Sequence, residues 1–434
     1  MKKEKGLLEE ASALGSILGL ESTKELMKRL GNPQEQLRFV HVAGTNGKGS
    51  TCTYISAILK EAGYKVGRYV SPILFDDLEC IQVDGVWIEK KDFNRHLEKV
   101  KKAVDSMIFH GQQHPTVFEI ETAVAFLEFF EKSCDIVVLE VGLGGRLDAT
   151  NIVTTVDCAV LCSISMDHMA ILGDTLEKIA WEKAGIIKKG TKVVSYPQDP
   201  RVVKVIEEVC KKQKAALYKA DISTLHQIEY GLERTKFHDK NSFFGEELTL
   251  ETKMLGENQV KNAKLAIEVT GVLREGGYKI TRENIINGIK NAEWKGRFSL
   301  LHKEPYVIVD GAHNEEAAIS LKKSEKLYFK GKKIIRILGI FKDKEYEKIV
   351  KETVDKDDVV ITIRPPQERG LEAEILANCV RKYAKDVITA ESTDKALTLG
   401  LNMAEPEDVI LIYGSLSYVK EVYAYFYKKG KKVF

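Results

Sequence analysis

The chain has 434 residues, of which 44% are hydrophobic and 30% are charged, and its formal net charge is +2. That length exceeds what one ordinary hydrophobic core accommodates, so we expect two or three domains. The nearly balanced charge gives no reason to expect a nucleic-acid or membrane-surface partner. No run approaches the ~18 uninterrupted apolar residues of a membrane span, so we expect none.

The cysteines and the first residues bear on the compartment. The seven cysteines are scattered without a C-x-x-C pair, and two of them, Cys158 and Cys162, lie in one apolar run. This pattern predicts reduced thiols in a cytoplasmic protein. Lys2 and Lys3 come first, but Glu4 follows at once, so we expect no signal peptide.

The first two predicted elements are a helix and a strand. Leu and Met recur at helical spacing over residues 6–30, and Gly31-Asn32-Pro33 stops that run. We therefore expect helix over 6–30. The apolar residues Phe39, Val40 and Val42 then predict a buried strand.

A glycine-rich turn follows that strand, within the segment 37–51, LRFVHVAGTNGKGST. A strand that is followed by a glycine-rich turn and the start of a helix is an arrangement that can bind a polyphosphate. Glycines let backbone N–H groups approach the oxygens, Lys48 supplies a positive charge, and Ser50 or Thr51 can face Mg²⁺. The sequence of this motif is unusual, because Gly49 separates Lys48 from the hydroxyl of Ser50. The alternative is a plain strand-to-helix turn, but lysine and hydroxyl in register favour a nucleotide site.

A strand–helix–strand rhythm continues from this loop. A helix is predicted over 51–63, and the next strand ends at Ser71. The rhythm predicts a mostly parallel, doubly wound α/β sheet with ligands at the carboxyl ends of its strands. Thr116 and Glu119 then have the spacing of a capping box, which explains them without a ligand. A ligand contact by Thr116 or Phe118 needs separate evidence.

Three further residues lie at predicted strand or helix ends. The run 135–141, DIVVLEV, predicts a buried strand with Glu140 near its carboxyl end. A buried carboxylate is costly unless it is paired or metal-bound, and a strand-end acid after a P-loop suits Mg²⁺. A structural salt bridge is the alternative. From residue chemistry alone, His168 is a capping or core histidine, and Lys183 is a solvated lysine near a helix C-terminus.

The rest of the chain divides into a polar stretch and a second domain. Residues 190–250 show strand-like and turn-like pieces without assignable chemistry, and 256–270 return to a helical pattern. Trp294-Lys295-Gly296-Arg297 breaks the periodicity. We therefore predict a P-loop domain over residues 1–296 and a second domain over 297–434.

The second domain is predicted to be smaller and Rossmann-like, because strands and helices alternate in it. Its predicted strands are 306–310, 334–340, 359–363 and 409–414. It has no G-x-G-x-x-G motif, so nothing indicates a dinucleotide of its own. Its first strand leads into a polar cluster from Asp310 to Asn314, and its last strand ends at Gly414-Ser415.

The ordered motifs resemble those of a known family. In chain order the sequence contains HVAGTNGKGS, SPIL, TVFE, EVGLGGRLDATN, LGDTLEKIAWEKAGIIK, GENQ, DGAHN and GSLSYV. This wording, over nearly the whole chain, resembles folylpolyglutamate synthases and dihydrofolate synthases of the Mur-ligase superfamily. EVGLGGRLDATN, the EKAGI block and DGAHN are highly specific, whereas the P-loop alone marks only the superfamily.

The resemblance implies an ATP-dependent ligase that activates a folate or dihydropteroate carboxylate as an acyl phosphate and joins it to L-glutamate. It also implies a cytoplasmic monomer. Polyglutamylation of tetrahydrofolate is the leading reading, and an additional dihydrofolate synthase activity stays open. Two alternatives are a UDP-muramoyl amino-acid ligase, which DATN and DGAHN argue against, and a nucleotide-binding protein without turnover. Lys48, Glu140, His168 and Lys183 argue against the latter.

The resemblance also assigns residues. The ATP phosphates would be held by Thr45, Asn46, Gly47, Lys48, Gly49 and Ser50. The rest of the nucleotide site would be formed by Asn262, Arg297 and Asp310. The Mg²⁺ site would be formed by Ser71, Glu140 and His168. The pterin end of the acceptor would contact Thr116, Val117, Phe118, Glu119, Leu147, Asp148 and Ala149.

Two further assignments concern the glutamate and Lys183. The resemblance places His313, as a catalytic residue, and Ser415 near the incoming glutamate. Lys183 matches the family lysine that is carbamylated by CO₂, so the resemblance overrules the reading as a solvated lysine. Three positions depart from the family's usual motifs: Ile73, Cys80 and Asn258. They are expected to bear on which folate is preferred or on how its carboxylate is held.

Overall fold

The computed structural model describes residues 6–15, 17–240 and 243–428. Lys2, Lys3 and Glu4, on which the signal-peptide prediction depends, lie outside these residues. No helix in the described ranges has the length and apolar character to cross a membrane. The chain divides into two units that alternate along the sequence. Unit 1 comprises residues 1–225, 239–248 and 262–291, and unit 2 comprises 226–238, 249–261 and 292–434.

Unit 1 is built on an eight-stranded sheet with the order β4-β3-β2-β5-β1-β6-β7-β8. Its strands are β1 (Phe39–Ala43), β2 (Val66–Tyr69), β3 (Ile81–Val83), β4 (Val86–Trp87), β5 (Ile136–Glu140), β6 (Val156–Leu161), β7 (Lys192–Ser195) and β8 (Ala216–Lys219). In this spatial order, the neighbouring strands from β2 through β5, β1, β6 and β7 to β8 are parallel. Strands β3 and β4 form an antiparallel edge beside β2. The predicted mostly parallel α/β sheet is confirmed.

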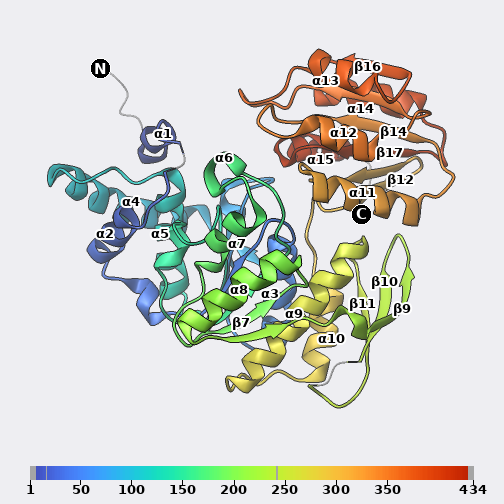
Figure 1. The fold of residues 1–434 in the computed structure, drawn as a ribbon. Coiled ribbons are helices and arrows are strands. Elements are labelled where there is room, and N and C mark those ends of the chain that lie inside the picture. The colour runs from blue at the N-terminus through green and yellow to red at the C-terminus, as the bar shows by residue number, and fades with distance from the viewer. Residues whose placement is uncertain (1–5, 16, 241–242, 429–434) are drawn as a thin grey trace. The chain divides into compact units, whose positions relative to one another are not determined.

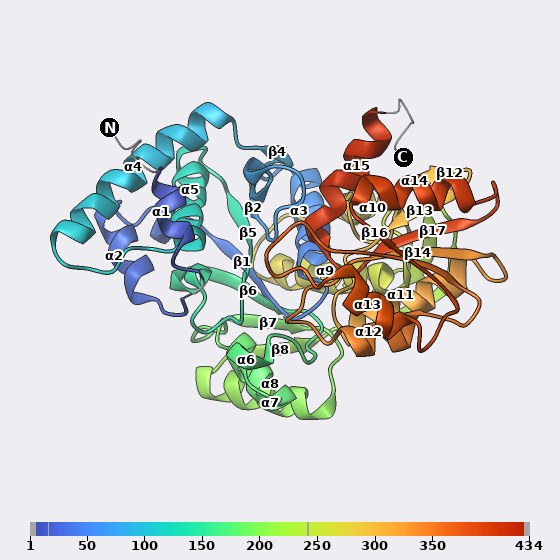
Figure 2. The ribbon, with the colours of Figure 1, turned by 90° about the horizontal axis from the view of Figure 1, so that it is seen from above.

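Helices lie on both faces of this sheet, with α4 and α5 on one side and α3 and α10 on the other (Figure 2). The helices of this part of the chain are α1 (Leu7–Ser12), α2 (Glu21–Arg29), α3 (Lys48–Glu61), α4 (Lys90–Phe109), α5 (Val117–Glu131), α6 (Met169–Leu172), α7 (Leu176–Ala184), α8 (Pro200–Gln213), α9 (Glu257–Glu275) and α10 (Arg282–Asn291). Short 3-10 turns add η1 (Pro33–Gln36), η2 (Asp77–Cys80), η3 (Ala149–Ile152) and η4 (Ile222–Thr224).

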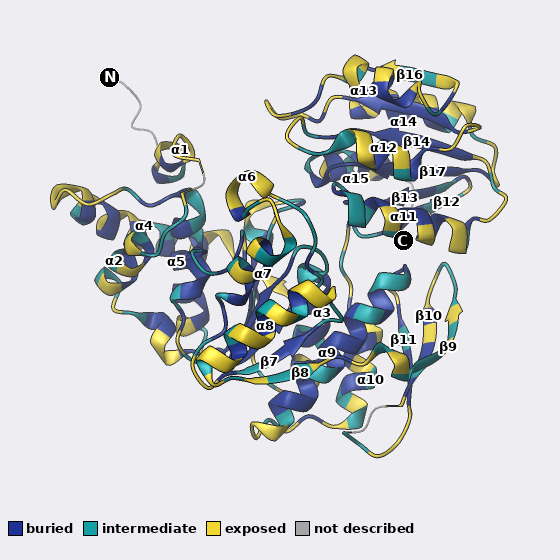
Figure 3. Cartoon of the chain, in the orientation of Figure 1, coloured by how far each residue is buried: buried dark blue, intermediate teal, exposed yellow. Residues whose placement is uncertain are grey.

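The central strands are buried on both faces because helices cover them. Every residue of β1 and of β5 is buried, and in Figure 3 the middle of the sheet is dark blue while outward helix faces are yellow. One core joins α4 and α5 to the sheet and includes Phe39 and Phe126, whose rings are 5.7 Å apart. A second core lies beneath α7 and α8. The loops after β1, β2, β5 and β6 therefore start from a rigid edge.

Unit 2 contains a six-stranded sheet with the order β12-β13-β17-β14-β15-β16 (Figure 1). Its strands are β12 (Ser299–Lys303), β13 (Tyr306–Val309), β14 (Ile334–Leu338), β15 (Val359–Ile363), β16 (Asp386–Ala390) and β17 (Val409–Tyr413). Only β12 is antiparallel to its neighbour. The helices are α11 (Glu315–Tyr328), α12 (Tyr346–Thr353), α13 (Ala373–Val380), α14 (Thr393–Met403) and α15 (Val419–Lys428), with the 3-10 turn η5 (Leu416–Tyr418).

A separate three-stranded sheet, β11-β10-β9, is made of β9 (Leu225–Tyr230), β10 (Thr235–Asp239) and β11 (Leu248–Thr252). Two sequence predictions need correction. Residues 6–30 hold two helices, α1 and α2, because Gly15 has φ +64° and Gly19 has φ +157°, which interrupt the helix between them. The polar stretch 190–250 contains the 14-residue helix α8 as well as strands. Strands β3, β4, β12 and β16 were not predicted.

All seven cysteines are buried, and each is a free thiol in the structure. The predicted boundary at residue 296 stays a prediction, because the compact units interleave along the chain.

Candidate functional site

The glycine-rich loop joins β1 to α3 through a conformation that only glycine adopts easily. Gly47 precedes α3 with φ +86°, and a Cβ added to it would lie 2.7 Å from Oδ1 of Asn262. A side chain here would therefore be strained and would also strike Asn262. Because α9 brings Asn262 to the loop, this predicted nucleotide residue lies beside the glycine-rich turn.

The loop is also bonded to the neighbouring strand. The N–H groups of Thr45 and Asn46 both donate to the carbonyl oxygen of Ser163, at 2.7 and 3.2 Å. The Nζ of Lys48 donates to the carbonyl oxygens of Gly44 and Thr45, at 3.1 and 3.3 Å. The side chain of Lys48 therefore folds back onto its own loop, close to the N–H groups at the start of α3. Such a combination of charge and helix N-terminus suits a phosphate.

Lys183 lies under the same loop. Its side chain, in the last turn of α7, is buried, and its Nζ donates to the carbonyl oxygen of Gly44 at 2.9 Å. Burial, helped by the charge of Lys48, lowers the pKa of Lys183 to about 7. A large fraction of this amine is therefore neutral near neutral pH. The reading of Lys183 as a solvated lysine is wrong, because the loop after β1 covers it.

Two of the three predicted metal residues lie together. Glu140 is the last residue of β5 and only 2% exposed, and its Oε2 accepts a hydrogen bond from the N–H of Ser71 at 3.2 Å. His168 precedes α6 with φ +51°, and its side chain is 41% exposed. No group of three or more His, Cys, Asp or Glu side chains suited to a metal occurs among the described residues.

The predicted capping box before α5 is confirmed. The N–H of Glu119 donates to Oγ1 of Thr116 at 3.3 Å, and the N–H of Thr116 donates to Oε2 of Glu119 at 2.7 Å. The other carboxylate oxygen of Glu119 accepts from Thr23 at 2.8 Å. Both members of the box are buried and already bonded, so they support α5. Phe118 is half-buried, and its ring lies directly over Gly142.

Asp148 ends a buried hydrogen-bonded chain. Its Oδ1 accepts the hydroxyl of Thr150 at 2.5 Å, and its Oδ2 accepts the N–H of Leu143 at 2.8 Å. Since the Thr150 hydroxyl hydrogen is used there, its oxygen must accept from Nε2 of His41, 2.9 Å away. Burial raises the pKa of Asp148, and burial with the charge of Lys188 lowers the pKa of His41 to about 3.

This chain of His41, Thr150 and Asp148 was missed from the sequence. His41 lies on β1, and Thr150 is 109 residues away in the turn after β5. Both lie inside motifs, HVAG and LDATN, but neither motif shows that the two side chains meet. No local spacing could have indicated the contact.

Four predicted residues lie in unit 2, at the carboxyl edge of the paired strands β13 and β17. Asp310 is half-buried and accepts N–H groups of Phe298 and Ala312, each at 2.7 Å, and the desolvation of its carboxylate raises its pKa. Arg297 lies against Gly311, where an added Cβ would be 2.3 Å from Nη1. The remaining two are His313 and Ser415.

His313 and Ser415 have defined local contacts. Nδ1 of His313 is 2.7 Å from the carbonyl oxygen of Gly311, so Nδ1 carries a proton and points back to the loop. Ser415 precedes η5, and its Oγ accepts the N–H of Ser417 at 3.2 Å. Both serve the loop geometry at this strand edge. Their relation to glutamate stays a prediction.

The three departures from the family's wording have structural roles. Cys80 is buried at the end of η2 and donates to the carbonyl oxygen of Asp77 at 3.0 Å. Ile73 packs against the core beneath α5. Asn258 donates through Nδ2 to Oγ of Ser320 at 2.7 Å within unit 2.

Comparison with known proteins links this geometry to characterised chains. Residues 42–270 match the Mur ligase middle domain, and 296–416 match the Mur ligase glutamate ligase domain. The chain is similar to the dihydrofolate synthase/folylpolyglutamate synthase of Bacillus subtilis, with 39% identity over 340 residues, covering 77% of this chain and 78% of that protein.

Two solved structures are similar over nearly the full length. One is folylpolyglutamate synthase of Mycobacterium tuberculosis complexed with ADP and AMPPCP, with 26% identity, a TM-score of 0.88 and coverage of 97% and 98% of the two chains. The other is a bifunctional folylpolyglutamate synthase/dihydrofolate synthase with Mn, AMPPNP and L-glutamate bound. It has 29% identity, a TM-score of 0.83 and coverage of 98% of each chain.

Proposed function

The chain belongs to the family of folylpolyglutamate synthases and dihydrofolate synthases within the Mur ligases, and on that premise we propose how its residues perform the reaction. The protein is an ATP-dependent ligase that adds L-glutamate to a folate. We take tetrahydrofolate as its main acceptor and dihydropteroate as a second acceptor. The observation that carries the residue assignments is the buried amine of Lys183 on the P-loop carbonyl of Gly44, at 2.9 Å.

The first chemical step is phosphoryl transfer. A carboxylate oxygen of the acceptor attacks the γ-phosphorus of ATP, the bond from that phosphorus to the bridging oxygen breaks, and ADP leaves with the electron pair. The product is an acyl phosphate. The N–H groups at the start of α3 and the ammonium of Lys48 bind and orient the phosphates, and this positioning supplies most of the catalysis in such reactions.

The second step forms the amide. The neutral amine of L-glutamate attacks the acyl carbon, a tetrahedral intermediate forms, and inorganic phosphate leaves as the amine loses a proton to solvent. We assign His313 and Ser415 to the glutamate side, since both lie at one strand edge of unit 2. Phe118 and residues Leu147–Ala149 are assigned to the pterin end, with Asp148 held by Thr150.

Ser71, Glu140 and His168 are proposed to hold Mg²⁺. Two of these residues fit the ion in the structure: Glu140 is a buried carboxylate at a strand end, and Ser71 lies next to it. His168 is assigned through the resemblance. Mg²⁺ is usually held by one or two carboxylates, with phosphate oxygens and water completing its shell. When bound, it would neutralise charge on the β- and γ-phosphates. Mn bound in the bifunctional relative supports a divalent ion here.

Lys183 is proposed to carry a carbamate. The nitrogen lone pair of the neutral amine attacks the carbon of CO₂, a C–N bond forms, one C–O π pair moves to oxygen, and the nitrogen loses a proton to solvent. Burial beneath Gly44 favours this step, because it disfavours the ammonium form. The product turns a neutral amine into an anion next to the phosphate loop, which suits a divalent ion there.

The function is tested by ADP release in the presence of ATP, Mg²⁺, L-glutamate and either tetrahydrofolate or dihydropteroate. We expect ADP release that requires both the acceptor and glutamate, together with a product heavier by one glutamyl residue. Activity with both acceptors would establish that the enzyme is bifunctional. Activity with only one acceptor would restrict the enzyme to that reaction. ADP release that ignores acceptor and glutamate would refute the proposal.

A further inference from the structure

Arg146 bonds the loop after β5 to the last turn of α7. Its backbone N–H donates to the carbonyl oxygen of Glu182 at 2.7 Å, and its Nη2 donates to Oε1 of the same residue at 2.9 Å. Its guanidinium also lies over the ring of Trp181, with Cζ 4.5 Å from the ring centroid. One arginine therefore holds two consecutive residues of α7 through three contacts, one from its backbone and two from its guanidinium.

The two backbones touch where this contact forms. A Cβ added to Gly145 would lie 2.7 Å from the carbonyl oxygen of Glu182 and 2.9 Å from that of Lys183. A Cβ added to Gly185 would lie 2.3 Å from Cβ of Arg146. Side chains at either glycine would push the loop and the helix apart.

Asn151 closes the same contact from the other side. Its Nδ2 donates to the carbonyl oxygens of Arg146 and Gly185, at 3.0 and 3.1 Å. Its own backbone carbonyl and Oδ1 accept from Nζ of Lys188, at 2.8 and 2.7 Å. The last turn of α7 is thus bonded to the segment 145–151 through both backbone and side chains.

Lys183 follows Trp181 and Glu182 in this turn. Successive helical side chains point about 100° apart, and Lys183 reaches Gly44 of the P-loop while its two predecessors contact Arg146. A loosened turn would shift the Lys183 amine away from the loop. On the other side, Arg146 directly precedes Leu147 and Asp148, which we assign to the acceptor.

We propose that Arg146 is a positioning residue: it holds the final turn of α7 so that Lys183 stays against the P-loop, and it ties that turn to the acceptor-binding segment 147–149. This inference rests on the proposed function, which supplies the role of Lys183. A purely structural role for Arg146 predicts little change on mutation, because a partly exposed Arg–Glu pair contributes little to stability.

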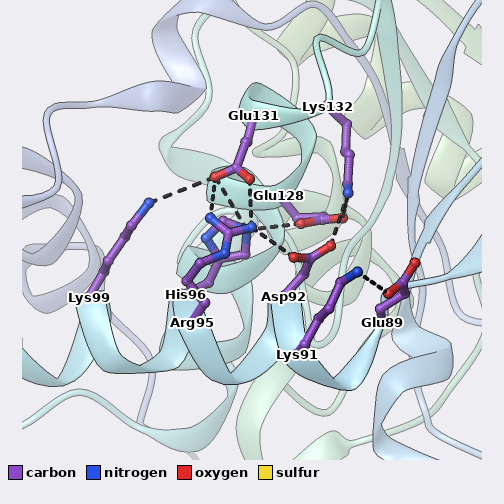
Figure 4. A network of polar contacts seen from close by, with 9 residues as sticks. All are labelled: Glu89, Lys91, Asp92, Arg95, His96, Lys99, Glu128, Glu131 and Lys132. Atoms are coloured by element: carbon purple, nitrogen blue, oxygen red, sulfur yellow. Dashed lines mark hydrogen bonds and ion pairs between the residues drawn. The ribbon is translucent and has the colours of Figure 1, made fainter.

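The network of α4 and α5 offers a matched control, Arg95 (Figure 4). The side chain of Arg95 is 39% exposed and that of Arg146 is 38% exposed, and each bonds a neighbouring carboxylate. Arg95 bonds Glu131 and Asp92 at 2.5 and 2.9 Å. The Arg95→Met variant loses an equivalent arginine–carboxylate contact away from Lys183.

The experiment compares Arg146→Met, Arg146→Lys and Arg95→Met with wild type. For Arg146→Met we expect kcat to fall by about tenfold to a hundredfold, the cost of a small misplacement, with the KM for ATP unchanged. In ¹³CO₂-enriched buffer its Lys183 carbamate signal in ¹³C NMR should be weaker than in wild type, and added bicarbonate at fixed pH should raise it. Arg146→Lys should recover part of the kcat and part of the carbamate signal. Arg95→Met should retain the wild-type kcat and carbamate signal.

A second readout does not depend on the ligase reaction. Hydrogen exchange should become faster at residues 183–187 in Arg146→Met, and stay unchanged at β7. The inference would be overturned if Arg146→Met showed the same hydrogen exchange, carbamate signal and kcat as wild type. If Arg146→Met does not fold, Glu182→Gln replaces it with the same criteria. Failure of the proposed function would appear in wild type, as ADP release without acceptor and glutamate, and would leave the exchange test intact.

Discussion

Lys183 and Lys178 lie on the same helix in opposite surroundings. Lys178 is 63% exposed and bonds Asp174 at 2.8 Å, whereas Lys183 is buried against Gly44. We predict that Lys183→Ala lowers turnover by about two to three orders of magnitude, as expected when a preorganised charge is removed from the phosphate site. Short carboxylates such as acetate should restore part of the activity, because they can supply the missing anion.

Steady-state ADP release with and without acetate measures this prediction. Lys178→Ala is the control, and it should keep wild-type turnover. Near-wild-type activity of Lys183→Ala would refute the carbamate assignment.

His41 makes a separate prediction about stability. In the unfolded chain its pKa is near 6.5, and in the folded protein burial lowers the pKa to about 3. Between these values the unfolded state binds more protons. The free energy of unfolding therefore falls as pH drops from 6.5 towards 3, by up to about 1.4 kcal/mol per pH unit from this group. We predict that His41→Gln shows a smaller loss of stability than wild type between pH 7 and pH 5.

Urea denaturation at the two pH values measures the difference. His110→Gln, which replaces an exposed histidine, should lose as much stability as wild type over this interval. An equal loss in His41→Gln and wild type would contradict a neutral, buried His41.

Single residues differed in how far the sequence predicted their surroundings. The reading of Lys183 from residue chemistry failed because its burial depends on Gly44, 139 residues away. Only the resemblance singled out this lysine. The surroundings of Glu140 were easier to predict, because a carboxylate at the end of a run of apolar residues by itself indicates a buried strand end.

The turn before α3 gives a prediction at the scale of an element. Gly47 and Gly63 flank α3 with nearly equal φ, +86° and +85°, but an added Cβ meets Asn262 at Gly47 and nothing within 4 Å at Gly63. Alanine should cost about 1–2 kcal/mol of backbone strain at either site. We predict that only Gly47→Ala also weakens ATP binding, because the loop must shift away from Asn262.

Calorimetric titration with a non-hydrolysable ATP analogue tests this pair, with thermal unfolding as the measure of strain. Equal affinities in Gly47→Ala and Gly63→Ala would contradict a role for this close contact in shaping the phosphate loop.

Elements with strong local signals were predicted well. The glycine-rich turn before α3 and the capping box of Thr116 and Glu119 depend on residues only a few positions apart. The structure contains a helix start after that turn and confirms the capping box. Helix α8 also carried a signal that was overlooked. Asp199 caps it, Pro200 begins it, and its buried residues have the period of an amphipathic helix: Val202, Ile206 and Cys210.

At the scale of the whole molecule, alternation of strands and helices correctly predicted two α/β sheets. It could not predict how the units interleave, because residues 226–238 and 249–261 belong with unit 2 through contacts that no local pattern records. Likewise, the sheet orders depend on long-range pairing, such as β1 between β5 and β6. The site assignments in both units stay proposals that mutation can test.

The central claim is that the acceptor carboxylate is activated by phosphoryl transfer before glutamate attacks. The most direct test uses an acceptor labelled with ¹⁸O in both oxygens of its reacting carboxylate, with mass spectrometry of the released phosphate. We predict that each phosphate formed in the complete reaction carries one ¹⁸O from the acceptor. Phosphate without the label, released together with the amide product, would contradict the acyl-phosphate route.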